Sequence, residues 1–238
     1  LLKKHESELC GTVKLMFQPA EEIFEGSVDM IGAGVLENPS VDAALMIHVM
    51  AGMPFAPGTV IVSDPGVSAP AADYFTIRVR GKGCHGSMPD TGVDPLTAAA
   101  HILIALQEIP SRELAINDRA VLTVGTLHAG TAANAIPDEA VMSGSLRTFD
   151  EGVRDKIKVR MTDIAEGIAG AFRAGAELTF GSGCPTLKND KALSAEASRY
   201  AKELLGEGRA FTVAELSAGG ASGSAGSEDF AYISQRVP

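Results

Sequence analysis

The chain has 238 residues, with 20 basic and 30 acidic side chains and a net charge of −10 at pH 7. This acidic surplus disfavours nucleic acids and anionic membranes as partners, because both attract Lys and Arg. No apolar run reaches the ~18 residues that a membrane span needs. Hydrophobic residues make up 45% and charged residues 21%, which is typical of a core-forming soluble protein and suits chemistry on small molecules.

The cysteines and the two ends of the chain give further expectations. Cys10, Cys84 and Cys184 do not make a disulfide framework, which fits a reducing compartment and predicts a cytoplasmic protein. The chain begins at Leu1 in a segment of helical character, and it ends at Pro238 directly after a segment that looks like the middle of a domain. We therefore expect an internal piece of a longer polypeptide, truncated at both ends.

The first part of the chain predicts a βαβ unit. Residues 12–17 alternate in polarity as a strand does, residues 27–36 predict a helix, and residues 41–49 are nearly all apolar. An apolar run of that length is typical of a strand buried on both faces of a parallel sheet. Residues 50–66 predict a loop rich in Pro and Gly around a short strand at 59–62.

The pattern changes near residue 71 and predicts a second, inserted domain. Residues 74–80 alternate with period two, as a half-buried antiparallel strand does. Asp94-Pro95 predicts the start of one helix, and Thr148 with Glu151 forms a capping-box pattern before another. The other predicted strands are 121–127, 140–147 and 176–180. The order βαββαβ is the split-βαβ pattern of a ferredoxin-like sandwich.

After residue 185 the chain is expected to return to the first domain. Asp190 caps a predicted helix that Gly206 ends. Beyond it the pattern predicts a strand at 210–216, a loop at 217–227 and a helical turn at 228–234. The predicted fold class is α/β, with one domain formed by residues 1–70 and 186–238 and an α+β domain inserted at 71–185.

Two adjacent carboxylates, Glu21 and Glu22, follow the first predicted strand, and His48 stands at the end of the second. If the two strands are parallel neighbours, these side chains meet at the sheet edge where open α/β folds place their chemistry. One carboxylate then binds a metal ion while the other takes a proton from metal-bound water. The structural alternative is an acidic first turn of a helix and a histidine that only ends a strand.

A series of motifs connects this pair to a known family. FQPAEE, IHV, GKGCHGSMP, GVDPL, NAIPDEA, GSLRTF and GSEDF follow one another along nearly the whole chain. In this order they resemble the N-acyl-amino-acid amidohydrolase family, which includes hippurate hydrolases and indole-acetyl-amino-acid hydrolases and belongs with the di-metal peptidases of aminoacylase and carboxypeptidase G type. The resemblance implies a partial di-metal peptidase catalytic domain with an inserted ferredoxin-like domain for lid movement and dimerisation.

The resemblance implies that Glu21 is the general base, which activates water for attack on an amide carbonyl, and that Glu22 and His48 are metal ligands. It also implies two divalent metal ions per full site, with zinc favoured and manganese or cobalt as alternatives. The family takes its other ligands from an earlier segment and from a late histidine. Neither segment is in this chain, and Cys10 and His5 do not sit in the ligand motif. Because zinc sites need three or four protein ligands, we expect an incomplete metal site.

The GKGCHG motif at 81–86 has two interpretations. It matches the G-x-G-x-x-G pattern of nucleotide-binding loops, but Met88-Pro89 follow where that pattern needs a helix. The family resemblance instead implies that His85 reaches the active site of a partner subunit and hydrogen-bonds the substrate carbonyl oxygen or its oxyanion. The structural alternative is a solvated loop histidine. Cys84 departs from the family, which has a small non-thiol residue there.

Three further motifs carry roles only through the resemblance. Asn134 in NAIP is implied to contact the substrate, and Arg147 in GSLR to grip the substrate's carboxylate with its planar guanidinium. Glu228-Asp229 in GSEDF is implied to lie beside the active-site cleft. The structural alternatives are a turn asparagine, an arginine in a surface salt bridge and an acid pair at the start of a helix.

Together the motifs imply metal-dependent hydrolysis of the amide bond of N-acyl amino acids or short peptides, by a homodimer joined through the inserted domain. Two alternatives stay open. A desuccinylase or dipeptidase of the same broad family would keep the chemistry and change the substrate. An inactive dimerisation module would keep only the function of the inserted domain. The sequence leaves the acyl group, the amino acid and the metal open.

Overall fold

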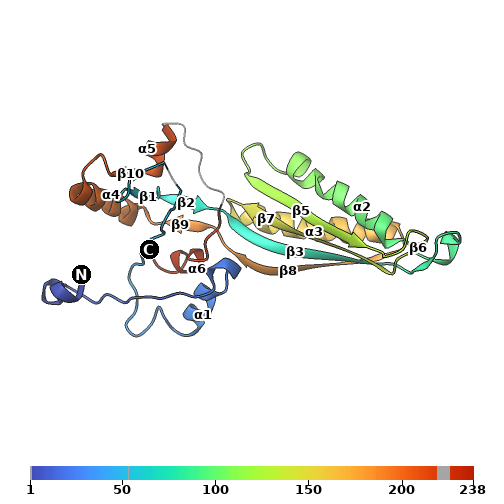
Figure 1. Cartoon of the computed structure of the whole chain (residues 1–238), viewed down its shortest axis with the longest axis horizontal. Coiled ribbons are helices and arrows are strands. Elements are labelled where there is room, and N and C mark those ends of the chain that lie inside the picture. The colour runs from blue at the N-terminus through green and yellow to red at the C-terminus, as the bar shows by residue number, and fades with distance from the viewer. Residues whose placement is uncertain (1, 53, 219–225) are drawn as a thin grey trace.

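The computed structural model describes residues 2–52, 54–218 and 226–238 of the chain. Figure 1 shows a long sheet with two helices at one end of the molecule, and short strands and helices at the other end, where both termini lie. The helices are α1 Gly26–Gly32, α2 Pro95–Leu106, α3 Glu151–Ala171, α4 Lys191–Leu205, α5 Val213–Ala218 and α6 Ala231–Ser234. The strands are β1 Val60–Val62, β2 Gly66–Ala69, β3 Ala71–Arg80, β4 Cys84–His85, β5 Ala120–Ala129, β6 Ala135–Ile136, β7 Glu139–Thr148, β8 Gly175–Cys184, β9 Leu187–Asn189 and β10 Ala210–Thr212. Within these ranges no helix is both long and apolar enough to cross a membrane.

A four-stranded antiparallel sheet, in the order β5-β7-β3-β8, forms the inserted part of the fold. Helices α2 and α3 pack against each other and against this sheet. Phe75, Ile77 and Val79 alternate along β3 and are buried in one core with Ile157 and Met161 of α3. The predicted ferredoxin-like order of strands and helices is confirmed.

Aspartates begin the three longest helices. Asp94 accepts hydrogen bonds from two backbone N–H groups of α2, as predicted, and Asp190 does the same for α4. At α3 the capping residue is Asp150, which accepts from the N–H of Val153 at 2.9 Å. Thr148, the predicted cap, is fully buried as the last residue of β7. The capping-box prediction is therefore wrong, because the strand continues to the position where the cap was expected.

The predicted βαβ unit at the start of the chain does not form. Residues 12–17 and 41–49 belong to no strand, and Phe17 and Ile47 are 84% and 83% exposed. A strand needs a neighbour that takes up its backbone N–H and C=O groups, and no segment in the described ranges pairs with either stretch. The apolar pattern reports a tendency to be buried, but it does not supply the pairing strand. The helix between the two stretches is also shorter than predicted and ends at Gly32.

Two short strand pairs lie outside the inserted part. β1 pairs with β10 in parallel, and β2 pairs antiparallel with β9 where the chain enters and leaves the inserted part. The predicted strand at 210–216 is too long, because β10 ends at Thr212 and α5 begins at the next residue. The predicted loop at 217–227 lies largely outside the described residues.

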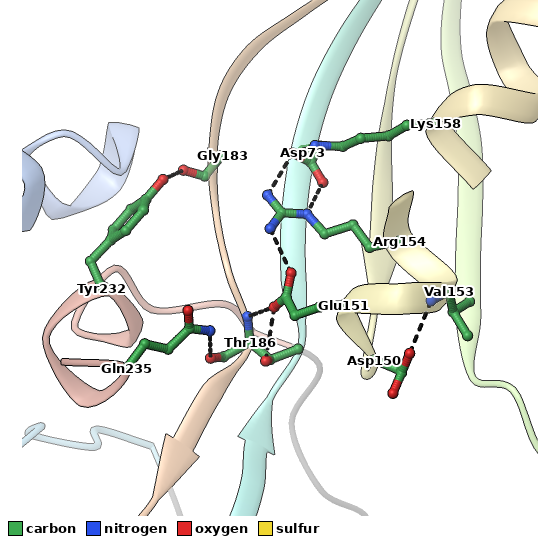
Figure 2. A network of polar contacts seen from close by, with 10 residues as sticks. All are labelled: Asp73, Asp150, Glu151, Val153, Arg154, Lys158, Gly183, Thr186, Tyr232 and Gln235. Carbon is green, nitrogen blue, oxygen red and sulfur yellow. Dashed lines mark hydrogen bonds and ion pairs between the residues drawn. The ribbon is translucent and has the colours of Figure 1, made fainter. Parts of the chain in front are cut away.

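An ion-pair network ties α3 to both places where the chain enters and leaves the inserted part (Figure 2). Arg154 donates from Nε and Nη2 to the two carboxylate oxygens of Asp73, at 2.7 and 2.8 Å, and from Nη1 to Glu151 at 2.8 Å. Lys158 donates a further hydrogen bond to Asp73 at 2.7 Å. Glu151 accepts from the N–H and the hydroxyl of Thr186, just beyond the end of β8. Helix α3 therefore fixes the chain both where it enters and where it leaves the inserted part.

The contacts of this network outweigh the effect of burial on its charges. Burial alone would raise the pKa of Glu151, but hydrogen bonds from Thr186 and Arg154 lower it. Burial alone would lower the pKa of Arg154, but hydrogen bonds to Asp73 and Glu151 raise it. Glu151 and Arg154 are therefore both charged at neutral pH.

Candidate active site

Glu21 and Glu22 lie in a 3-10 turn, Glu21–Ile23, between two residues of unusual backbone conformation. Ala20 and Phe24 have φ angles of 56° and 59°, in the left-handed region that residues other than glycine rarely adopt. Such conformations cost about 1–3 kcal/mol each and persist only where the surrounding structure holds them. Local preference alone therefore does not explain the shape of this turn.

Gly26 lets the chain fold back on the residues that precede the turn. A Cβ atom at this position would lie 1.7 Å from the carbonyl oxygen of Pro19 and 2.9 Å from the side chain of Gln18. Both distances are far inside van der Waals contact, so the close approach requires glycine.

Replacing Gly26 with alanine is expected to lower the free energy of unfolding by roughly 2 kcal/mol, because the methyl group would overpack the contact with Pro19. Gly32 lies in the same helix, and a Cβ atom there meets no atom within 4 Å, so Gly32→Ala is the matched control. Urea denaturation followed by circular dichroism compares the two variants. Equal losses of stability would contradict the close approach.

Glu21, Glu228 and Asp229 bring together carboxylate oxygens that lie within 4.8 Å of one another. Asp229 is fully buried and the other two are half-buried. Burial raises the pKa of Glu21, the charges of Glu228, Glu22 and Asp229 raise it further, and His48 opposes them. Burial is also the largest cause of the raised pKa of Glu228. A positive charge among these carboxylates would stabilise their ionised forms.

This carboxylate cluster, Glu21 with Glu228 and Asp229, suits a divalent cation. Carboxylate oxygens bind zinc and manganese in proteins. The cation's charge would offset the mutual repulsion of the carboxylates and the effect of their burial. Among the described residues, this is the one group of three or more Asp, Glu, His or Cys side chains whose possible ligand atoms lie this close together.

The other two predicted residues of this site lie outside the carboxylate cluster. Glu22 is exposed. His48 is also exposed, and its Nδ1 lies 2.9 Å from the carbonyl oxygen of Val49. Both are close enough to Glu21 to affect its pKa. The roles of Glu22 and His48 as metal ligands, like that of Glu21 as general base, stay predictions.

Sequence reasoning did not identify Glu228 and Asp229 as possible ligands. The available signal was the acid pair of GSEDF after a stretch rich in Gly and Ser, together with its implied place beside the cleft. No periodicity links this pair to Glu21, because the two stand far apart along the chain and meet only through the fold.

Arg147 connects the inserted sheet to the segment that carries the acid pair. It lies next to the last residue of β7, and its Nη1 donates to Ser227 Oγ at 2.8 Å. Ser227 directly precedes Glu228 in the chain. A guanidinium in this position is suited to bind a substrate carboxylate near the carboxylate cluster, and that role stays a prediction.

His85 and Asn134 lie together at the opposite end of the inserted part, where β4 pairs with β6 (Figure 1). The N–H of Gly86 donates to the carbonyl oxygen of Asn134 at 2.8 Å, and both His85 and Asn134 are exposed. Helices α1 and α6 lie close in sequence to the residues of the carboxylate cluster. They lie at the other end of the molecule. The structure therefore brings these two residues together with each other but not with Glu21.

The glycine motif at 81–86 does not lead into a helix of the kind that holds a pyrophosphate. A 3-10 turn, Pro89–Thr91, follows it, and α2 begins only at Pro95. This arrangement agrees with the rejection of the nucleotide-binding interpretation.

Comparison with known proteins places these features in a family. Residues 71–172 match the family model described as a peptidase dimerisation domain. An N-acetylcysteine deacetylase of Bacillus subtilis is 37% identical over 238 residues, which cover 100% of this chain and 59% of that protein. An IAA-amino acid hydrolase of Arabidopsis thaliana is 33% identical over 242 residues, which cover 100% of this chain and 52% of that protein. The chain spans little more than half the length of these relatives.

A solved structure from Bacillus subtilis, described as a dinuclear metal binding peptidase from the M20 family, has the same fold. It is 33% identical, it superposes with a TM-score of 0.74, and the match covers 100% of this chain and 56% of that one. The predicted fold is thereby confirmed as part of a di-metal peptidase domain with an inserted ferredoxin-like domain. The matched dimerisation domain and this fold are those of M20 peptidases, and the chain resembles such proteins along its whole length.

Proposed function

We propose that the protein containing this chain is a metal-dependent amidohydrolase of N-acyl amino acids. The observation that carries the proposal is the carboxylate cluster, which places Glu21 among buried or half-buried acidic side chains and close to Glu22 and His48. By their names, one relative deacetylates N-acetylcysteine and another hydrolyses IAA-amino acids. Both names describe the release of an amino acid from an acyl group, and we assign the same class of substrate here.

The chain's own residues divide the chemistry among them. When bound, two divalent ions, with zinc favoured over manganese or cobalt, would polarise the amide carbonyl and lower the pKa of water. Glu22 and His48 would hold them, with further ligands outside this chain. Glu21 accepts the proton of the attacking water and passes it to the leaving amine. Arg147 binds the carboxylate of the substrate through parallel hydrogen bonds.

We further propose a homodimer in which each inserted domain serves the partner's site. The match to a dimerisation domain supports the dimer. The exchange is supported by Figure 1, in which the β6 end of the molecule, where His85 and Asn134 lie, is far from helices α1 and α6. The N–H and the hydroxyl of Ser87 both lie within hydrogen-bond distance of His85 Nδ1, at 3.2 and 2.8 Å. Nε2 of His85 would donate to the substrate carbonyl oxygen, with Asn134 beside it.

The complete protein is expected to release amino acid from N-acetylcysteine or hippurate and to lose this activity in EDTA, because the ions supply the electrophile. Adding back zinc, manganese or cobalt singly identifies the metal. Succinylated amino acids and dipeptides, assayed in parallel, test the desuccinylase and dipeptidase alternatives. A complete protein that dimerises, binds no metal and releases no amino acid would overturn the proposal and favour an inactive dimerisation module.

A further inference from the structure

Asp229 joins the two ends of the turn that carries Glu21. Its Oδ1 accepts a hydrogen bond from Gln18 Nε2, and its Oδ2 accepts one from the N–H of Ser27 at 3.0 Å. Gln18 precedes the turn and Ser27 follows it, in the first turn of α1. One carboxylate from the C-terminal segment therefore fixes both ends of residues 18–27.

Gln18, Ser27 and Asp229 form a closed ring of hydrogen bonds, which the backbone N–H of Ser27 closes. Ser27 Oγ lies 2.6 Å from Gln18 Oε1, to which it donates, and 3.3 Å from Asp229 Oδ1. Ser27 and Asp229 are fully buried. Both oxygens of Asp229 already accept bonds from the protein, so few of its roughly four acceptor positions remain for a metal ion. These contacts suit a residue that orients its neighbours better than they suit a metal ligand.

The turn needs such a restraint. Ala20 and Phe24 hold left-handed backbone conformations, and the backbone of Gly26 closes against Pro19. Strained conformations relax unless several contacts oppose them. The hydrogen-bond ring supplies these contacts from a part of the chain remote in sequence.

We propose that Asp229 is a positioning residue which, through Gln18 and Ser27, holds the strained turn so that Glu21 points into the carboxylate cluster. The catalytic consequence of this inference rests on the proposed function, whereas the restraint on the turn does not. Groups that orient the residues of a metal site typically contribute 10- to 100-fold to metal affinity or activity.

The experiment uses three variants of the complete protein. Asp229→Asn places an amide donor opposite the donors of Gln18 or Ser27, and Gln18→Glu places a carboxylate against Asp229. In the double variant Gln18→Glu/Asp229→Asn, the amide nitrogen introduced at position 229 can donate to the carboxylate introduced at position 18, while the amide oxygen accepts from Ser27. We expect each single change to lower kcat and the affinity for zinc about 10- to 100-fold, with KM changed far less. We expect the double change to restore much of both losses.

Hydrogen exchange of the peptide covering residues 17–30 supplies a readout that is independent of catalysis. Faster exchange at Ser27 is expected in each single variant and slower exchange again in the double variant. Ser27→Ala, which removes only the hydroxyl, tests the ring with a smaller risk of misfolding and is expected to show the same losses to a lesser degree. Asp190→Asn, at the start of α4, is the control for a carboxylate-to-amide change that leaves activity unaltered.

Two results would overturn the inference. If Asp229→Asn removes metal binding while Ser27→Ala and Gln18→Glu leave it unchanged, Asp229 is a direct ligand and not a positioning residue. If exchange at Ser27 is the same in all variants, the ring does not hold the turn. Failure of the proposed function gives a different result, in which the unaltered protein hydrolyses no N-acyl amino acid although the exchange pattern follows the prediction.

Discussion

Glu21→Gln is expected to lower kcat for hydrolysis of N-acyl amino acids about 10²- to 10⁴-fold, the range over which a positioned general base contributes. The amide has nearly the size of the carboxylate, so the turn and the hydrogen-bond ring around Asp229 should stay intact. The glutamine amide does not accept a proton at neutral pH, so it cannot act as the base. Because Glu21 acts on the reacting proton and not on the bound substrate, KM should change little.

The measurement compares steady-state kinetics of the complete protein with those of two other variants. Glu25→Gln is the control, because Glu25 is exposed and close to Glu21 in the same segment but outside the carboxylate cluster. It is expected to retain full activity. If Glu21→Gln retained activity and Glu228→Gln lost it, the general base would be Glu228.

The inserted domain and the first domain differ in how far the sequence alone predicts them. The alternation of Phe75, Ile77 and Val79 predicts β3 correctly. Its pairing strands β7 and β8 both belong to the inserted domain, so the neighbours that β3 needs are present. Residues 12–17 and 41–49 have equally strand-like patterns. Many of their large apolar side chains stay exposed, and no described segment pairs with them. A polarity pattern predicts which face is buried but not whether a neighbouring strand is present.

The candidate site shows the same limit at the level of single residues. Glu21 and Glu22 stand out as an acid pair after a proline, so their chemistry can be read from the sequence. The contacts of Asp229 with Gln18 and Ser27 cannot, since they join segments at opposite ends of the chain. Likewise, nothing in the sequence pattern of α3 predicts that Glu151 accepts a hydrogen bond from the N–H of Thr186 and takes no part in a capping box.

Arg154→Met is expected to lower the free energy of unfolding by about 3 kcal/mol, since breaking a buried ion pair typically costs about 3–5 kcal/mol. The side chains of Arg154 and Asp73 are only 14% and 7% exposed. Methionine keeps much of the aliphatic stem, so the loss is electrostatic. Lys158 still pairs with Asp73, which places the expected loss at the low end of the range. Urea denaturation followed by circular dichroism measures it.

Arg160 provides a control on the same helix. It also pairs with two carboxylates, those of Glu113 and Asp163, but its side chain is 36% exposed. Solvent screens such a pair, and Arg160→Met should therefore destabilise the protein much less than Arg154→Met. Equal losses would show that burial of the pair does not matter.

A double variant separates the effect of the buried carboxylate from the effect of the contacts of Arg154. Arg154→Met leaves the carboxylate of Asp73 buried with Lys158 as its remaining partner, whereas Arg154→Met/Asp73→Asn removes that carboxylate as well. The double variant should therefore be less destabilised than the sum of the two single variants, because residues in one ion-pair network are not additive. If the losses of unfolding free energy are additive, Asp73 is stabilised mainly by Lys158. Arg154 then acts chiefly through Glu151, which binds Thr186.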